Sequence, residues 1–185
     1  MKLCLSGCYY IQPEKNTAIS LFEKAASQSH IKSHVALGRL YRSDSSDSVT
    51  NYEKAFEHLN IAHESGDAEA SFELALLLDS VTEGYTTDLT LALKYYHLAK
   101  KRGFSSAILY NNMAVIYMKN KKFRRAKKYF EKAKNFLKSE DSELNDLITK
   151  NIEKLSNEKN LDFLNSVLAT VLCIIIFLLI ISFTG

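Results

Sequence analysis

Proline and glycine are scarce in this chain, which contains one proline, six glycines and no tryptophan in 185 residues. Proline and glycine mark turns and strand ends, so their scarcity argues against many short strands joined by tight turns. The three cysteines are too few and too scattered for a disulfide framework or a pair of zinc knuckles, and they favour a reducing compartment. The composition therefore indicates an all-α protein.

A large net charge is also missing. The chain has 24 Lys or Arg and 21 Asp or Glu, and a net charge of +3 gives no general attraction to nucleic acid. The distribution is uneven, however, because residues 119–138 contain ten basic side chains and one acidic one. We call this segment the basic strip.

What the chain does contain is a recurring triplet of alanine, a large residue and alanine, with the second and third members four and seven positions after the first. Residues at these spacings share one face of a helix. Successive triplets start 37, 37 and 34 residues apart, which predicts helical hairpins that stack on one another. The triplets are Ala18–Phe22–Ala25, Ala55–Leu59–Ala62, Ala92–Tyr96–Ala99 and Ala126–Phe130–Ala133.

The hairpins follow from this register. Leu5, Ser6 and Tyr9 precede Ala18 by the distances at which matching residues precede Ala126, so they are predicted to form the first helix of a compact first hairpin. The triplet helices are expected over 14–28, 51–65, 88–102 and 122–137, and the other first helices over 31–43, 67–80 and 105–119. The expected domains are repeats over 1–138, a capping helix over 139–157, a linker over 158–162 and a transmembrane helix over 163–183.

These residues carry a family resemblance. The 34-residue spacing around Ala114, Ala126 and Phe130 resembles a tetratricopeptide repeat. The 37-residue units, with Leu37-Gly38 and a glycine at 103, resemble its Sel-one-like relative. The resemblance implies an α-solenoid of about four helical hairpins that binds a protein or peptide on its concave face. In this architecture the first helices line that face, which implies partner-binding roles for Lys32, Arg39, Arg42, Ser71, Glu73, Tyr110 and Asn111.

The C-terminal segment from Phe163 to Phe183 has no charged residue. Its 21 residues would span about 31 Å as a helix, close to the thickness of a bilayer's hydrocarbon core. Three lysines lie shortly before it and no basic residue follows it, which places the repeat domain in the cytoplasm. The sequence thus predicts a single-pass membrane protein with a C-terminal anchor.

The basic strip has two possible roles. It is either a solvated helix face or a surface for anionic lipid, to which each cation near the membrane contributes about 1 kcal/mol. Its aromatic residues follow the packing period, so none is available to stack on bases, and we expect no nucleic-acid binding. The predicted lipid-surface residues are Lys121, Lys122, Lys127 and Lys128.

Catalytic patterns are incomplete. Ser29-x-x-Lys32 and Ser156-x-x-Lys159 match the serine–lysine spacing of penicillin-recognising enzymes, but the accompanying Lys-Thr-Gly and Ser-Asp-Asn elements are absent. We therefore expect the protein not to be an enzyme, and to take no cofactor and no small-molecule substrate.

Metal and lipid-attachment patterns are equally weak. His30 and His34 lie four apart on one predicted helix, but no third ligand has a matching spacing, so no metal is expected. Residues 5–8 resemble a lipoprotein attachment motif without the apolar stretch that it requires. The sequence thus predicts a membrane-anchored interaction scaffold with a helical-repeat groove. The alternative is a membrane-surface assembly factor that acts through its transmembrane helix and the basic strip.

Overall fold

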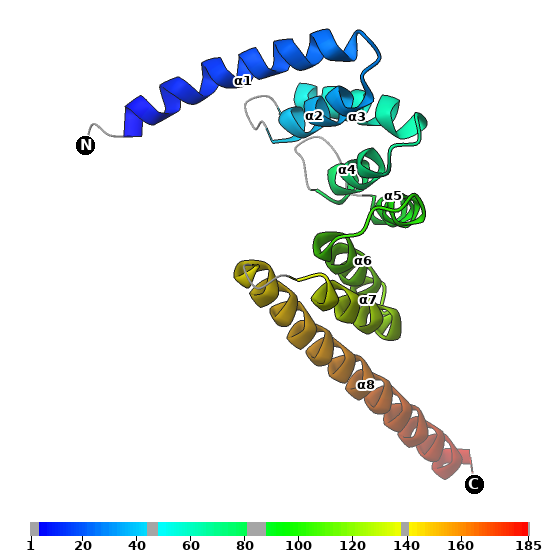
Figure 1. Cartoon of the computed structure of the whole chain (residues 1–185). Coiled ribbons are helices and arrows are strands. Elements are labelled where there is room, and N and C mark those ends of the chain that lie inside the picture. The colour runs from blue at the N-terminus through cyan, green and yellow to red at the C-terminus, as the bar shows by residue number, and fades with distance from the viewer. Residues whose placement is uncertain (1–3, 44–47, 81–87, 138–140, 185) are drawn as a thin grey trace. The chain divides into compact units, whose positions relative to one another are not determined.

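The computed structural model describes residues 4–43, 48–80, 88–137 and 141–184, and the side chains of 15–43, 51–80, 88–137 and 141–174 (Figure 1). Over these residues all the regular structure is helical, which confirms the all-α prediction. The chain divides into two compact units, 1–105 and 106–185. The helices are α1 (Cys4–Ala26), α2 (Ile31–Arg42), α3 (Ser48–Glu64), α4 (Ala68–Asp79), α5 (Leu89–Lys101), α6 (Ala107–Lys119), α7 (Phe123–Asn135) and α8 (Ser142–Thr184).

In the first unit, α2 pairs with α3 and α4 pairs with α5, while α1 packs against α2. The triplets of α3 and α5 are fully buried, as the sequence register predicted. A Cβ atom on Gly38 would lie 2.4 Å from Cγ of Leu59, so the close approach of α2 to α3 requires glycine there. The repeated small and large residues therefore set the packing of both hairpins.

The same turn recurs after α1, α3 and α5. Ser29, Gly66 and Gly103 lie 37 residues apart and have φ angles of 62°, 87° and 98°. In each turn the next amide donates to a carbonyl oxygen in the last turn of the helix, at 3.0–3.2 Å. This is the left-handed ending typical of helices, and glycine adopts it at the least cost.

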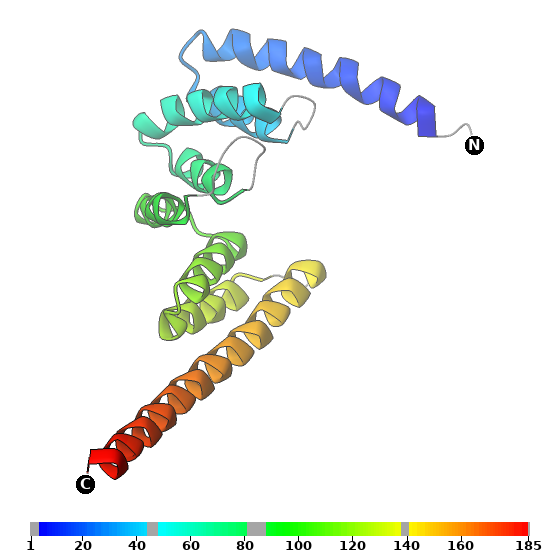
Figure 2. The ribbon, with the colours of Figure 1, turned by 180° about the vertical axis from the view of Figure 1, so that it is seen from behind.

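The predicted first hairpin is not formed. Figures 1 and 2 show α1 as one unbroken helix. Its bounds, Cys4–Ala26, include Pro13, and the described residues form three hairpins rather than about four. The fourth repeat, with the same spacing, turns at Lys121, which has a φ of 55° and donates its N–H to the Met118 carbonyl at 2.8 Å. The register places Pro13 at this position. Proline has neither the positive φ nor the N–H that this turn uses, so the turn of the fourth repeat cannot form in the same way here.

The second unit consists of the α6–α7 hairpin and α8, which packs on it. The triplet of α7 is fully buried, and Ile148 and Leu155 of α8 are buried as well. Both residues lie within the capping helix expected over 139–157. No break separates them from the apolar C-terminal segment, because α8 runs through the expected linker over 158–162.

The expected membrane span is corrected by the structure. Within the described part of the chain, no helix combines the length and the apolar character needed to cross a membrane. Of the predicted segment 163–183, the side chains of 175–183 lie outside the described residues. The absence of a spanning helix from the described residues overturns the transmembrane helix over 163–183, the single-pass C-terminal anchor and the cytoplasmic placement that depended on it.

Candidate functional site

Lysine and arginine side chains of α2 meet carboxylates of α4 on one surface of the first unit. At its outer edge, Lys32 Nζ lies 2.9 Å from Asp67 Oδ2 and 3.2 Å from Glu69 Oε2. Hydrogen bonds to Asp67 and then to Glu69 raise the pKa of Lys32. Burial alone would raise the pKa of Asp67, but the hydrogen bonds from Lys32 and from the Ala70 N–H prevail and lower it. Lys32 and Asp67 thus hold each other in the charged form.

The centre of this surface is a buried carboxylate with two arginines. Arg39 Nε donates to Glu73 Oε1 at 2.5 Å, and Arg42 Nη2 donates to Oε2 at 3.1 Å. Arg39 Nη2 also donates to Glu69 Oε1 at 2.6 Å. Burial lowers the pKa of Arg39, but Glu73 and Glu69 outweigh it and the net change is upward. A carboxylate as buried as Glu73 requires such partners, since an unpaired buried charge is strongly destabilising.

The two signs of charge differ in exposure. The side chains of Lys32, Arg39 and Arg42 are 61%, 45% and 34% exposed, whereas that of Glu73 is 3% exposed. We call this surface the α2–α4 charged face. Its exposed cations are held in place by less exposed carboxylates. Guanidinium groups held in this way are suited to the recognition of other carboxylates.

Ser71 is not on this surface but in a buried network. Its hydroxyl donates to the Asp67 carbonyl at 3.0 Å and lies 3.0 Å from His63 Nδ1. Arg102 Nη1 donates to Ser71 Oγ at 2.7 Å and to the His63 carbonyl at 3.0 Å. Burial, and next the Arg102 charge, lower the pKa of His63. The sequence pattern gave no indication of this role for Arg102.

The two histidines that the sequence offered as a possible metal pair, His30 and His34, each contact a different residue in the structure. His34 Nδ1 lies 3.1 Å from Nδ1 of His58, which is on another helix, and His30 Nδ1 lies 2.8 Å from Ser33 Oγ. Burial and then His34 lower the pKa of His58. Across the side chains that the structure describes, no group of three His, Cys, Asp or Glu residues could hold a metal.

In the second unit, α8 lies over the remaining predicted partner-binding residues. Asn151 Nδ2 donates to Oδ1 of the buried Asn111 at 3.0 Å. Tyr110 is also buried, with its ring centroid 5.2 Å from that of Phe136. Of the seven predicted residues, three cations therefore share an exposed surface, Glu73 supports them from below, and Ser71, Tyr110 and Asn111 are buried.

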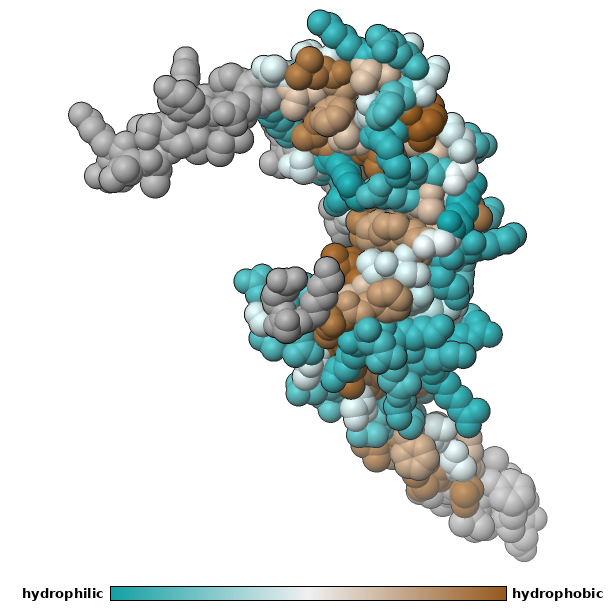
Figure 3. Space-filling view, in the orientation of Figure 1, coloured by the Kyte–Doolittle hydropathy of each residue, from teal (hydrophilic) through white to brown (hydrophobic). Residues whose placement is uncertain are grey.

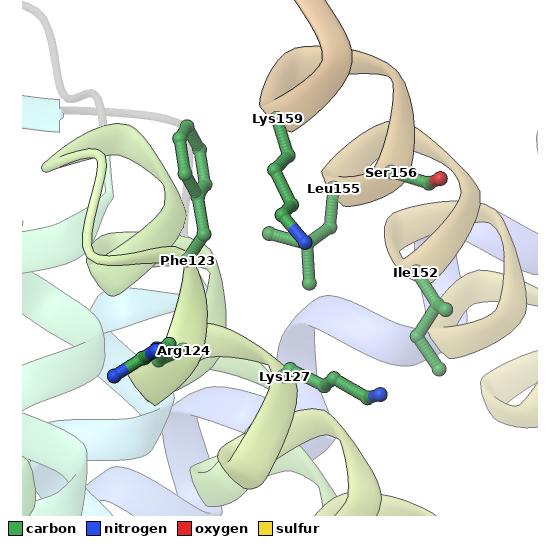
Figure 4. Close-up of a pocket in the computed structure, with 7 residues that line it drawn as sticks. All are labelled: Phe123, Arg124, Lys127, Ile152, Leu155, Ser156 and Lys159. Carbon is green, nitrogen blue, oxygen red and sulfur yellow. The ribbon is translucent and has the colours of Figure 1, made fainter. Parts of the chain in front are cut away.

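Part of the basic strip borders a cleft between α7 and α8. The cleft has a volume of about 490 Å³ and is shown in Figure 4, where side chains from both helices extend into the space between them. Its apolar lining is rimmed by three cations. The lining residues are Phe123, Arg124, Lys127, Ile152, Leu155, Ser156 and Lys159, and we call the site the basic cleft.

The four predicted lipid-surface lysines lie in or near this region, and Figure 3 shows the surface over α7 as largely hydrophilic. Lys127 lines the basic cleft, and Lys121 and Lys122 line a neighbouring hollow of about 390 Å³. Lys128 is exposed on α7. Lys121 Nζ lies 2.5 Å from Asp162 Oδ1, and this hydrogen bond raises the pKa of Lys121. The lysine side chains of the strip are therefore exposed, as expected, and one of them forms a hydrogen bond with α8.

Comparison with solved structures supports the fold. A Sel1 repeat protein from Oxalobacter formigenes is 20% identical with a TM-score of 0.56, over 74% of this chain and 54% of that protein. The protective antigen c5321 of uropathogenic Escherichia coli, which has an SLR fold, is 23% identical with a TM-score of 0.53, over 63% of this chain and 25% of the antigen. The chain thus spans about half the length of the first protein and a quarter of the second.

Comparison with protein families is more specific. No curated protein matches the chain. The Sel1 repeat model matches residues 9–30, 31–67, 68–104 and 110–135, which together make up more than half of the chain. The chain therefore belongs to the Sel1 repeat family, whose repeats generally mediate protein–protein interactions.

Proposed function

We propose that the protein is a non-enzymatic adaptor that binds an acidic segment of a partner protein on the α2–α4 charged face. The observation that carries this proposal is the set of three partly exposed cations above the buried Glu73. Lys32, Arg39 and Arg42 are the residues proposed to meet the partner. The family's general role in protein interaction supports the same reading.

Fixed cations bind at a lower entropic cost than free ones. Ordering a long side chain at an interface costs about 0.5–1.5 kcal/mol, and Arg39 is already ordered by two carboxylates. A guanidinium group has five N–H donors, so Arg39 retains donor capacity beyond the two bonds to Glu73 and Glu69. Carboxylates of an acidic helix or extended peptide match this donor pattern.

The geometry also supports the non-enzymatic part of the proposal. A lysine that acts as a general base needs a lowered pKa, whereas hydrogen bonds to two carboxylates raise that of Lys32. The Ser29–Lys32 pair is thus better explained as a helix turn followed by an ion pair. We expect no difference in hydrolysis of a chromogenic β-lactam between the wild type and Ser29→Ala.

Binding of defined peptides tests the adaptor proposal. The probes are a fluorescein-labelled Glu-rich helical peptide and its Lys-for-Glu counterpart, followed by fluorescence anisotropy on the full chain. Loss of a charged hydrogen bond in Arg39→Gln is expected to weaken binding of the acidic peptide about tenfold. Lys94→Gln, an exposed change on α5, is the matched control. Equal binding of both peptides, or equal affinity of the two variants, would contradict the proposal.

We propose as a second function that the basic strip contacts anionic lipid headgroups. The basic cleft favours it, because Arg124, Lys127 and Lys159 surround an apolar lining. Charge reversal of Lys121, Lys122, Lys127 and Lys128 should reduce sedimentation with phosphatidylserine vesicles, since each cation contributes about 1 kcal/mol. Equal sedimentation at low salt, or equal binding to neutral phosphatidylcholine vesicles, would leave the strip as a solvated face.

A further inference from the structure

The basic cleft of the second unit has an apolar part formed by both of its helices. Phe123 of α7 and Ile152 and Leu155 of α8 line this part, and Leu155 is buried. The cleft volume of about 490 Å³ lies within the range of about 300–1,000 Å³ that is usual for small-molecule sites. The apolar part therefore has room for the apolar portion of a ligand.

The neighbouring hollow of about 390 Å³ is almost entirely cationic. It shares Phe123, Arg124 and Lys159 with the basic cleft, so the two hollows adjoin. Its other lining residues are Lys121, Lys122 and Arg125. Figure 4 shows Lys159 extending from α8 toward α7. An apolar cleft thus lies directly beside a cationic hollow, which matches a molecule with an apolar chain and an anionic end.

The cations of the cleft differ from those of the first unit in lacking close acids. Among the described side chains, Arg124 and Lys159 take part in no ion pair, and Lys127 has only the exposed Glu131 at 4.0 Å. Like charges at one site repel one another, and an anion between them would replace this repulsion by attraction. Charge complementarity therefore favours an anionic ligand.

Two further features of the cleft favour the same ligand. α7 begins at Phe123, and the side chain of its N-cap residue, Lys122, makes no capping hydrogen bond, so the positive end of the helix dipole lies beside the cations. Ser156 precedes Lys159 by three residues on the same face of α8, and both line the cleft. The serine–lysine spacing at 156–159 thus places two hydrogen-bond donors at the site.

We propose that the basic cleft binds one molecule of a lysophosphatidate, a phospholipid with a single acyl chain and a terminal phosphate. The phosphate contacts Arg124 and Lys159, which line both hollows, and the acyl chain lies against Ile152 and Leu155. A phosphate monoester has about 1.5 to 2 negative charges and three acceptor oxygens, which match several cationic donors better than one carboxylate does. The inference rests on the second proposed function and narrows it from headgroups at a surface to one lipid in a site.

Competition binding tests whether both parts of the ligand are recognised. The probe is a short-chain lysophosphatidate labelled with a fluorophore, added to the full chain below its critical micelle concentration and followed by fluorescence anisotropy. Unlabelled lysophosphatidate should displace it, whereas a monoacylglycerol with the same chain and glycerol phosphate should each be at least about tenfold weaker. Equal displacement by either fragment would overturn the proposal. Displacement by the Glu-rich peptide at a lower concentration than lysophosphatidate would show a protein ligand instead, and would also overturn it.

Two pairs of α8 variants test where the probe binds. Lys159 lines the cleft, whereas the exposed Lys150 does not. Lys159→Glu should raise the dissociation constant of the probe at least about tenfold, because it removes a charged hydrogen bond and adds a repulsive charge, and Lys150→Glu should not. Ile152→Gln and Leu147→Gln compare the apolar part in the same way, since Leu147 is exposed outside the cleft. Circular dichroism checks that all four variants fold, and equal effects within either pair would overturn the proposal.

Vesicle sedimentation separates this inference from the function on which it rests. Lysophosphatidate binding without sedimentation on phosphatidylserine vesicles would contradict the surface function alone and support the cleft as a site for one lipid. Sedimentation without lysophosphatidate binding would leave the surface function standing and overturn the cleft as a lipid site.

Discussion

The first and fourth repeats have the same spacing of packing residues, but only the fourth closes into a hairpin. Its turn uses a φ of 55° at Lys121 and two hydrogen bonds of 2.8 Å, from the N–H groups of Lys121 and Lys122. The first repeat has Pro13 at the position of Lys121, and α1 continues through it. The same triplet is therefore fully buried in α7 and open in α1. The open triplet thus occurs in the repeat that has Pro13 at the turn position, and the buried one in the repeat that has Lys121 there.

The two units also use their basic residues differently. On the α2–α4 charged face, Arg39 and Arg42 are paired with a buried carboxylate. On α7, the nearest acid to Lys127 is Glu131, at 4.0 Å and well exposed, which is worth little. The charges of the first unit therefore connect neighbouring repeats, whereas most of those in the basic strip face solvent.

The largest expected effect compares the central residues of the open and closed triplets. Phe130→Ala removes a fully buried ring and should destabilise the second unit by about 3–5 kcal/mol. Phe22→Ala removes a partly exposed ring and should destabilise the first unit by about 1 kcal/mol. Urea unfolding at low protein concentration measures both. Equal losses would mean that the two faces are equally buried.

Exchange of the turn residues comes next. Lys121→Pro removes a turn hydrogen bond and imposes a negative φ, so it should destabilise the α6–α7 hairpin by about 3 kcal/mol. Lys119→Ala, at an exposed position two residues earlier, is the control. An unchanged unfolding midpoint for Lys121→Pro would show that the turn does not depend on this backbone conformation.

Acid should affect the two units differently. The pKa values of His58 and His63 are lowered in the folded state, so folding favours their neutral forms. This contribution to stability is complete above the ordinary pKa of about 6.5 and decreases as the pH falls through the folded-state values. Both residues lie in the first unit and the second unit contains no histidine, so the unfolding midpoint of the first unit should fall more below pH 6.5 than that of the second. A parallel fall, or an unchanged profile in a His58→Asn, His63→Gln variant, would contradict the assignment.

The smallest effect concerns the turn after α1. Ser29 has a φ of 62° where the equivalent turns have glycine, so Ser29→Gly should stabilise the first unit by about 1 kcal/mol. Gly66→Ser, the reverse change in the next repeat, should destabilise it by a similar amount. Chemical denaturation of both variants checks the pair. Destabilisation by Ser29→Gly would mean that its side chain contributes more than its backbone costs.

Helical periodicity explains what could be predicted from the sequence. Ala55, Leu59 and Ala62 share a face whatever surrounds them, so their burial followed from spacing alone. The φ requirement of the α6–α7 turn is not visible in that pattern, and the sequence predicted a separate helix beginning at residue 14, directly after Pro13. The length of the apolar segment from Phe163 was likewise taken as a membrane span, which the described helices do not support.

The candidate site was predicted only in part. The resemblance pointed to Lys32, Arg39, Arg42 and Glu73. Their pairing with one another was not predicted, and Glu69 was missed, although Lys32 and Glu69 lie one repeat of 37 residues apart. The burial of Asn111 could not be predicted, because it depends on how α8 packs across α6. Contacts between repeats follow the period, whereas contacts with a terminal helix do not.

The distance between the two ends of α1 tests most directly the claim that Pro13 keeps the first repeat open. Spin labels at Ser6→Cys and Lys24→Cys, with the native cysteines replaced by serine and excess unlabelled chain added, report this distance by double electron–electron resonance. We expect about 27 Å in an unbroken helix, and a population near 10 Å in Pro13→Asn, which allows the turn. A distance of about 10 Å in the chain that retains Pro13 would contradict the account.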